Sequence, residues 1–162
     1  MSLLKKLNYY VGYNLIMKNI EINFNHVVCF TIDSQKYALP LNHVERVLRM
    51  VAVSPVPDAP LWFIGMIDLQ GRVISVMDIR KRFNFSIRNP LPTDRLIVIK
   101  SKKQTFAITC DEVTSVMEVS GSDMNKATDS FDNNIPISYV IRKDSGMIMV
   151  LDIKRLIVNY EQ

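Results

Sequence analysis

From residue 26 onward, short apolar runs alternate with polar turns, a pattern typical of small β-strands. Val27–Ile32 and Tyr37–Leu39 flank a polar turn at residues 33–36 and predict a first hairpin. Pro40 has no N–H to donate, so it should end the pairing of the second strand. The chain therefore begins its regular structure with two short antiparallel strands.

The segment Asn42–Arg49 carries valine and leucine at helical spacing, which predicts a single helical turn with Asn42 as its cap. Three prolines within residues 55–60 then predict a stiff, extended connector. A second hairpin follows, with Trp62–Ile67 and Arg72–Met77 as its strands and a glycine in the turn between them.

Much of this pattern returns later in the chain. A shift of 69 positions places Val28–Met50 on Ile97–Val119 without a gap. After a longer connection, the sequence DIRK that begins at Asp78 returns as DIKR at Asp152, and each aspartate is placed to cap a short helix. A repeat on this scale predicts one supersecondary unit that is built twice.

Each unit supplies about five short strands, which is too few for a sandwich, whereas a small barrel removes exposed strand edges. Two barrels of about 60 residues each gain buried surface by packing together. We therefore predict an all-β protein with few short helices, made of two five-stranded barrels, with units at approximately 26–88 and 95–158 of a domain over 26–158. Residues 1–25 stand apart as an N-terminal extension that is flexible or not native, with Met17 as an alternative start.

Composition and charge narrow the function classes. The net charge of +4 comes from dispersed basic residues rather than from a cluster beside exposed aromatic residues, so nucleic-acid binding is disfavoured. No apolar run approaches the roughly 20 residues of a membrane-spanning helix. Cys29 and Cys110 lie in apolar strands and are expected to be buried, reduced thiols in a cytosolic protein.

No catalytic or metal-binding constellation emerges from the sequence. His26 and His43 lack cysteine, histidine or carboxylate neighbours at the spacing of metal ligands. The five glycines form no phosphate-binding loop. Asp78 and Asp152 are explained more simply as helix caps than as a catalytic pair. We expect a binding module rather than an enzyme, with no cofactor and no metal.

The segment Tyr37–Phe83 closely resembles the chemotaxis coupling proteins, the CheW family. The family pattern has a YALPI-like strand, a V-x-E-V segment, a P-x-x-P connector, G-V-x-N-L-R-G and V-x-P-V-x-D-L. In this chain the corresponding segments are Tyr37–Leu41, Val44–Val47, Pro57–Pro60, Gly65–Gly71 and Val73–Ile79. The family's V-D-x-V and L-L-D have counterparts at Cys110–Val113 and Val150–Asp152, so the resemblance covers about residues 26–158.

The resemblance implies two intertwined SH3-like barrels and a non-catalytic, cytoplasmic adaptor. Proteins of this family couple transmembrane chemoreceptors to the histidine kinase CheA. They bind the kinase's CheW-like regulatory domain and the cytoplasmic tip of methyl-accepting receptors, so they meet the membrane only indirectly. The resemblance also implies a partner-binding surface at the matching positions Leu41, Val44, Arg46, Val53, Gly65 and Gln70.

Two departures from the family pattern matter, one in V-x-E-V and one in N-L-R-G, where Asp68 also replaces the asparagine. Arg46 stands where the family has the glutamate of V-x-E-V, with Glu45 one place earlier, and Gln70 replaces the arginine of N-L-R-G. If positions 46 and 70 face each other, an acid–base pair has become arginine and an amide, which would alter partner choice more than stability. An adaptor for another signalling or pilus-motility pathway therefore stays open, as does, from another class, a nucleic-acid-binding barrel.

Overall fold

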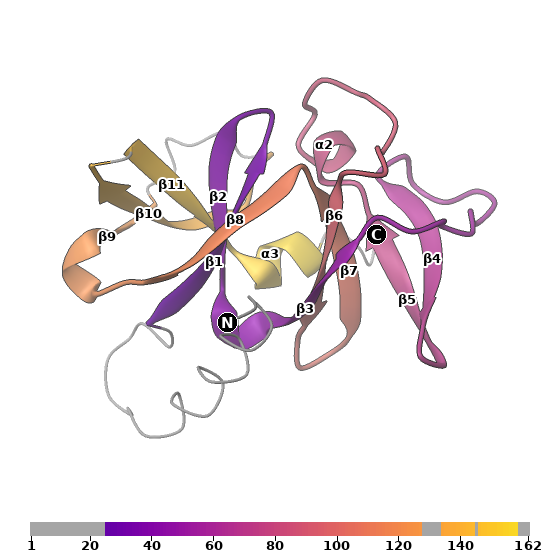
Figure 1. Cartoon of the computed structure of the whole chain (residues 1–162), viewed down its shortest axis with the longest axis horizontal. Coiled ribbons are helices and arrows are strands. Elements are labelled where there is room, and N and C mark those ends of the chain that lie inside the picture. Colours follow the sequence, from indigo (N-terminus) through magenta and orange to yellow (C-terminus); the bar gives the residue numbers. More distant parts are fainter. Residues whose placement is uncertain (1–24, 128–133, 145, 159–162) are drawn as a thin grey trace.

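The computed structural model describes residues 25–127, 134–144 and 146–158, so all but the last residue of the predicted N-terminal extension lies outside the described part. Figure 1 shows the strands in two groups that lie side by side. The strands are β1 (His26–Ile32), β2 (Gln35–Pro40), β3 (Val44–Arg49), β4 (Phe63–Leu69), β5 (Arg72–Met77), β6 (Arg95–Lys100), β7 (Thr105–Cys110), β8 (Glu112–Glu118), β9 (Met124–Lys126), β10 (Ile137–Lys143) and β11 (Gly146–Leu151). The helical elements are η1 (Leu41–His43), α2 (Ile79–Arg82), η2 (Gly121–Asp123) and α3 (Ile153–Val158).

Each sheet combines strands from both halves of the chain. One has the order β8-β1-β2-β11-β10-β9, and the other has the order β3-β6-β7-β5-β4. The sequence repeat pairs β1 with β6, β2 with β7, β3 with β8, β4 with β10 and β5 with β11. Under this correspondence the first five strands of one sheet become the other sheet, so the predicted repeat is present strand by strand. The units 26–88 and 95–158 exchange strands, and neither sheet coincides with one unit.

The repeat extends to irregular details. A register shift between Phe63 and Gly65 in the β4–β5 hairpin returns between Ile137 and Tyr139 in the β10–β11 hairpin. The two hairpins also join their sheets through equivalent parallel pairings, β5 with β7 and β11 with β2. Because the register shifts and the parallel pairings occur at equivalent positions, the two sheets have the same local structure.

The aspartates before the short helices act as the predicted caps. Asp78 Oδ1 accepts hydrogen bonds from the N–H groups of Arg80 at 3.0 Å and Lys81 at 3.4 Å. Asp152 Oδ1 accepts one from the N–H of Arg155 at 3.2 Å. Each carboxylate thus satisfies N–H groups that have no partner within the first helical turn.

The helical turn predicted over Asn42–Arg49 is wrong in its position. The helical turn is η1, which ends at His43, and residues from Val44 onward form strand β3. A register shift between Val44 and Arg46 inserts one extra residue against β6. Val44 and Val47 therefore pack into the same apolar cluster although they are three residues apart. The extra residue in the strand therefore produces the three-residue spacing that is typical of a helix.

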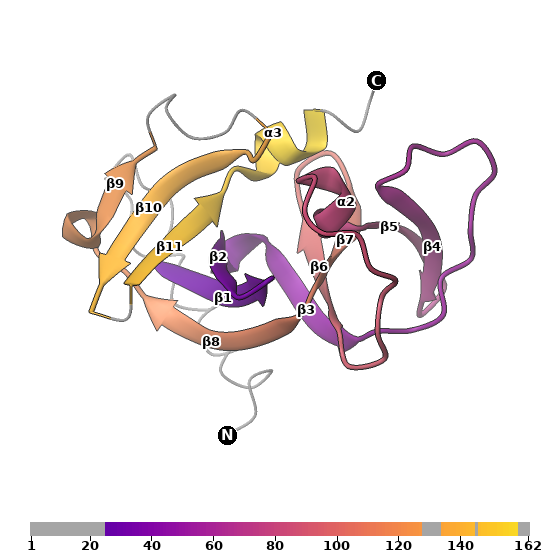
Figure 2. The ribbon, with the colours of Figure 1, turned by 90° about the horizontal axis from the view of Figure 1, so that it is seen from above.

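The largest apolar cluster lies between the two sheets and unites them. It contains side chains from both sheets and both α-helices, among them Phe30, Tyr37, Ile97, Phe106 and Leu156. Figure 2 shows α2 and α3 between the two groups of strands. Each sheet also has a smaller cluster of its own. The two cysteines are free and buried, as predicted. None of the helices in the described ranges is long and apolar enough to cross a membrane.

Candidate partner-binding surface

The β4–β5 hairpin ends in a tight turn that presents Gln70 to solvent. Gln70 and Gly71 both have positive φ, 55° and 84°, which is the backbone conformation of a two-residue hairpin loop that matches strand twist. Asp68 Oδ1 accepts a hydrogen bond from the N–H of Gly71 at 2.7 Å and holds the turn closed. The sequence had indicated positive φ only for Gly71, and Gln70 adopts it as well.

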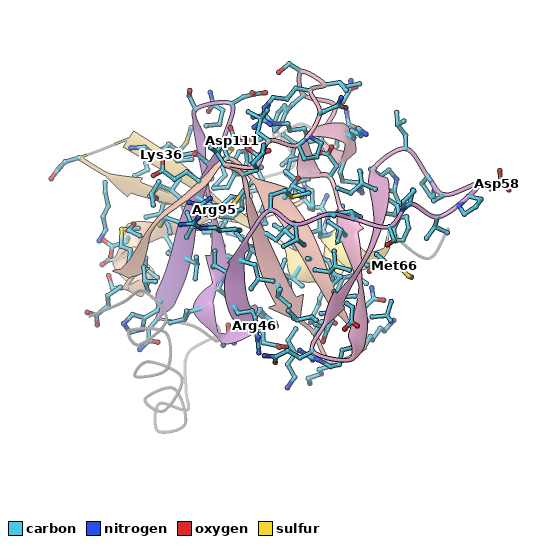
Figure 3. All side chains as sticks on the ribbon, turned by 45° about the vertical axis from the view of Figure 1, so that its right-hand side comes forward. Lys36, Arg46, Asp58, Met66, Arg95 and Asp111 are labelled. Atoms are coloured by element: carbon cyan, nitrogen blue, oxygen red, sulfur yellow. The ribbon has the colours of Figure 1, made fainter. Side chains whose placement is uncertain are left out.

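The two faces of this hairpin differ in how far they are exposed to solvent. Ile67 and Ile74 point into the small core of their sheet. Met66 and Val73 lie on the outer face, where Val73 is 70% exposed. Leu61, just before the hairpin, is also exposed, at 72%. Figure 3 labels Met66 on this part of the molecule. A hairpin with apolar side chains on both faces buries one face in the fold and leaves the other available for a partner.

Gly65 allows the proline-rich connector to join the sheet. The N–H of Ser54 donates to the carbonyl oxygen of Met66 at 2.9 Å, and the N–H of Met66 donates to the carbonyl oxygen of Ser54 at 2.8 Å. A Cβ atom at Gly65 would lie 2.2 Å from the Ser54 oxygen and 2.7 Å from Val53 Cγ1. The glycine is therefore required by close approach of the connector, which continues from β3 and closes this barrel against β4.

An ion pair links β3 to the hairpin. The guanidinium of Arg72 pairs with the carboxylate of Glu45, and Arg46 Nε lies 3.8 Å from Glu45 Oε1. The acid–base contact between the two segments is thus made by Glu45 and Arg72, one residue before Arg46 and two residues after Gln70. Although positions 46 and 70 differ in charge from the family pattern, an ion pair is present in the same part of the surface.

The six residues predicted to bind partners fall into three environments. Arg46 and Val53 are half-buried and Gln70 is exposed, so all three have accessible atoms. Gly65 is buried beneath the connector. The remaining two, Leu41 and Val44, lie in the core between the sheets, at 0% and 5% exposure.

The outer residues of the hairpin were missed by the sequence argument. Met66 and Val73 occupy the outward positions of the period-two alternation in β4 and β5. Arg72, directly after the turn glycine, lies on the other face of β5, opposite Leu69. The alternation was visible in the sequence, but which of the two apolar faces was buried depended on the neighbouring strands.

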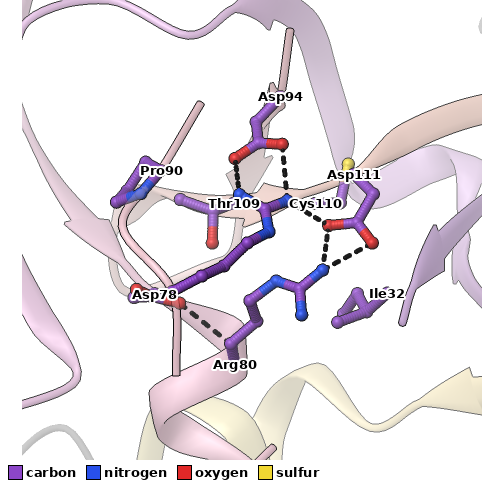
Figure 4. Close-up of a pocket in the computed structure, with 9 residues that line it drawn as sticks. Ile32, Asp78, Arg80, Pro90, Asp94, Thr109, Cys110 and Asp111 are labelled. Atoms are coloured by element: carbon purple, nitrogen blue, oxygen red, sulfur yellow. Dashed lines mark hydrogen bonds and ion pairs between the residues drawn. The ribbon is translucent and has the colours of Figure 1, made fainter. Parts of the chain in front are cut away.

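A cluster of ion pairs lines a small cavity between the sheets (Figure 4). Arg80, from α2, pairs with Asp33 in the β1–β2 turn and with Asp111 after β7. Arg88 binds Asp94 through two hydrogen bonds of 2.7 and 2.8 Å and reaches Asp111 at 2.9 Å. Each arginine therefore contacts two carboxylates and shares Asp111 with the other, and the cluster ties together segments that belong to different sheets.

The ion pairs stabilise the charged form of two of these carboxylates. The hydrogen bond from Arg80 lowers the pKa of Asp33 below its ordinary value. Burial opposes ionisation of Asp94, but hydrogen bonds from Arg88 and from the N–H of Leu91 outweigh it, so the pKa of Asp94 is also lowered. The carboxylates and guanidinium groups satisfy one another, which makes the cluster a structural joint rather than a ligand site.

Within the described ranges, no group of three or more histidine, cysteine, aspartate or glutamate side chains is arranged to hold a metal ion. His43 Nδ1 makes a hydrogen bond of 3.2 Å with the carbonyl oxygen of Lys100. His26 Nδ1 contacts the side-chain oxygen of Asn25 at 3.1 Å. Both histidines thus have hydrogen-bond partners within the protein. In the described ranges, the accessible groups that a partner could contact are apolar side chains and ion pairs.

Comparison with known proteins identifies the family. The profile of the CheW-like domain matches residues 26–161. The chemotaxis protein CheW of Thermotoga maritima is 26% identical over 81% of this chain and 86% of its own length, and that of Bacillus subtilis is 23% identical over 78% and 82%. A crystal structure of the scaffolding protein TtCheW from Thermoanaerobacter tengcongensis superposes with a TM-score of 0.73 at 23% identity, covering 80% of this chain and 89% of that one. This likeness confirms the predicted fold of two intertwined SH3-like barrels. The chain belongs to the family of proteins with a CheW-like domain.

Proposed function

We propose that this protein is a non-catalytic adaptor that couples chemoreceptors to a CheA-type histidine kinase in the cytoplasm during chemotaxis signalling. The observation that carries the proposal is the CheW-like domain, which extends over residues 26–161. Relatives named as chemotaxis proteins support it, as does the fold shared with a scaffolding protein. The partners are the regulatory domain of the kinase and the cytoplasmic tip of a methyl-accepting receptor.

We assign a partner contact to the outer face of the β4–β5 hairpin and to the neighbouring part of β3. Val73 and Met66 offer exposed apolar area for the centre of an interface. The Glu45–Arg72 ion pair, whose arginine lies beside the hairpin turn on the opposite face of β5, supplies charged groups next to it. Among the residues inferred from the family pattern, Arg46 and Gln70 belong to this surface. Val53 and Gly65 support it from below by fixing the connector, and Leu41 and Val44 support it from the core.

The test is direct binding of the purified protein to a CheA-type regulatory domain and, separately, to a receptor cytoplasmic fragment. Replacing Val73 by aspartate should weaken one of these complexes by about tenfold or more, because full burial of a valine side chain contributes about 1.5–3 kcal/mol. Met147→Asp is the matched control, since Met147 holds the equivalent position in the β10–β11 hairpin and is 49% exposed. If the wild-type protein binds neither partner, the proposed function is wrong. Equal effects of both variants would reject the assigned surface alone.

An adaptor role in another motility pathway is the second candidate. It is favoured by Arg46, which brings a positive charge next to the Glu45–Arg72 ion pair. An added charge at the rim of an interface acts mainly on partner choice, because it repels like-charged partners. Binding to receptor and kinase fragments from a pilus-motility system, measured beside the chemotaxis fragments, distinguishes the two roles.

A further inference from the structure

Two arginines lie directly opposite each other on neighbouring strands. Arg49, the last residue of β3, is the cross-strand partner of Arg95, the first residue of β6. Directly opposite residues of an antiparallel pair project from the same face with their Cβ atoms about 5 Å apart. Like charges in this arrangement destabilise a sheet. The pair therefore opposes the pairing of the two strands that carry it.

No acidic side chain of the described ranges forms an ion pair with either arginine. Neither guanidinium takes part in a salt bridge within 4.0 Å there, and the Asp94 carboxylate, adjacent in sequence to Arg95, is bound by Arg88. Arg95 Nη1 donates to the main-chain carbonyl oxygens of Thr93 at 2.6 Å and Asp94 at 3.3 Å. Arg49 is exposed to solvent. Arg95 is half-buried, so Arg49 presents the more accessible of the two positive charges.

The internal repeat shows that the fold does not require this pair. The same place in the other sheet is occupied by His26 of β1 and Glu118 of β8, which are also direct cross-strand partners. A shift of 69 positions carries His26 onto Arg95 and Arg49 onto Glu118. The equivalent pair therefore has no repulsion between two permanent positive charges. A local conflict that the fold can avoid elsewhere indicates a function outside the fold.

Apolar side chains accompany the arginines. Val51 and Leu91 are both exposed. The main chain brings their segments together, because the N–H of Met50 donates to the carbonyl oxygen of Asp94, and the N–H of Asp94 donates to the carbonyl oxygen of Leu91, each at 3.0 Å. All the large exposed apolar side chains of the described ranges are aliphatic. This combination suits carboxylates interspersed with apolar side chains, and it lacks the aromatic platforms on which nucleic-acid bases stack.

We propose that Arg49 and Arg95 form a docking site for an acidic segment of a protein partner. The proposal rests on the adaptor function proposed above and deepens it by giving the chemistry of one partner surface. Carboxylates of the partner would bind the two guanidinium groups and remove the repulsion between them, so the cost carried by the free protein is recovered on binding. The net charge of +4 favours the approach of an acidic partner.

Fluorescence anisotropy with a fluorescein-labelled peptide of alternating glutamate and leucine residues tests the site in the full-length protein. We expect binding that weakens with salt and that falls by about tenfold in Arg49→Glu. The matched control is Arg142→Glu, because Arg142 is exposed on β10 of the other sheet, and its effect should stay below about twofold. Equal losses in both variants, or no binding by the wild-type protein, would overturn the proposal. So would tighter binding of a single-stranded oligonucleotide that depends on Arg49.

Thermal stability supplies the second readout. Arg49→Glu replaces a repulsive cross-strand pair by an attractive one, so the melting temperature should rise by about 1–3 °C while peptide affinity falls. A melting temperature that falls together with affinity would mean that Arg49 supports the fold, and the docking site would be rejected. Because the assay contains neither kinase nor receptor, its failure leaves the measurement of the adaptor function intact.

Discussion

Replacing Arg80 by methionine should destabilise the joint between the two sheets. The Arg80 side chain is only 8% exposed, and its guanidinium binds the carboxylates of Asp33 and Asp111. Methionine keeps a similar apolar stem but removes the charge and its donors. The substitution therefore isolates the contribution of the ion pairs from that of packing.

The magnitude follows from opposing terms. Hydrogen bonds to charged groups contribute about 1.5–3 kcal/mol each, and Arg80 makes such bonds to two carboxylates. Removing a buried guanidinium also recovers its desolvation cost, which is several kcal/mol. The carboxylates left behind are 37% and 27% exposed for Asp33 and Asp111, so water reaches them, and Asp111 keeps Arg88. We expect a net loss of about 2–4 kcal/mol in the free energy of unfolding.

Urea denaturation followed by the fluorescence of Trp62, the single tryptophan, measures this loss. With a slope of about 2 kcal/mol per molar urea, the midpoint should fall by about 1–2 M. Arg72→Met is the control, because Arg72 is also ion-paired but is 49% exposed, and its pair should contribute at most about 1 kcal/mol. A midpoint for Arg80→Met as high as that for Arg72→Met would refute the argument that burial strengthens this cluster.

Three further predictions concern stability at acid pH, the substitution of two glycines, and the choice of partner. Because the pKa of Asp94 is lowered in the folded state, its stabilising contribution is present above its unfolded pKa of about 4 and is lost as pH falls through the folded pKa. Urea midpoints measured between pH 7 and pH 3 should therefore fall less steeply in Asp94→Asn than in wild type. Gly65→Ala should lower the free energy of unfolding by about 2–4 kcal/mol, because its Cβ would meet the connector main chain, whereas Gly71→Ala, with positive φ in open space, should lower it by about 1–2 kcal/mol. Thermal melts that rank the two glycines in the opposite order would contradict this. The double variant Arg46→Glu/Gln70→Arg should tighten binding to a chemotaxis receptor tip and change stability by at most about 1 kcal/mol; unchanged binding in a pull-down would show that these positions do not select the partner.

The sequence was sufficient for the strands and for their repetition, because both depend on local signals. Polar turns separate apolar runs, and the shift of 69 positions carries β1, β2 and β3 onto β6, β7 and β8. The exchange of strands between the units was not predictable in detail, because periodicity says nothing about which strands become neighbours. The bulge near Val44 also defeated the periodicity argument, since an extra residue gives a strand the spacing of a helix.

The candidate surface was harder to predict for the same reason. Glu45 and Arg72 are distant in the sequence, and their ion pair depends on barrel closure. The opposition of Arg49 and Arg95 depends on the register of β3 against β6. Of the family positions, Arg46 and Gln70 belong to the proposed surface, whereas Leu41 and Val44 lie in the core. Pairing between strands, which one sequence does not reveal, decided which side chains meet.

The exchange of strands has a consequence for how the protein is assembled from its two units. An interruption between α2 and β6 would leave two pieces, neither of which contains the strands of a complete sheet. The connecting segment therefore acts as a tether that converts a bimolecular association into an intramolecular one, at the high effective concentration that a short linker provides. Recovery of β-sheet circular dichroism on mixing the separate pieces would measure the strength of that association. A single unit that paired with a second copy of itself would form the same arrangement of strands. The protein therefore has the architecture of a strand-swapped homodimer whose two subunits are joined in one chain.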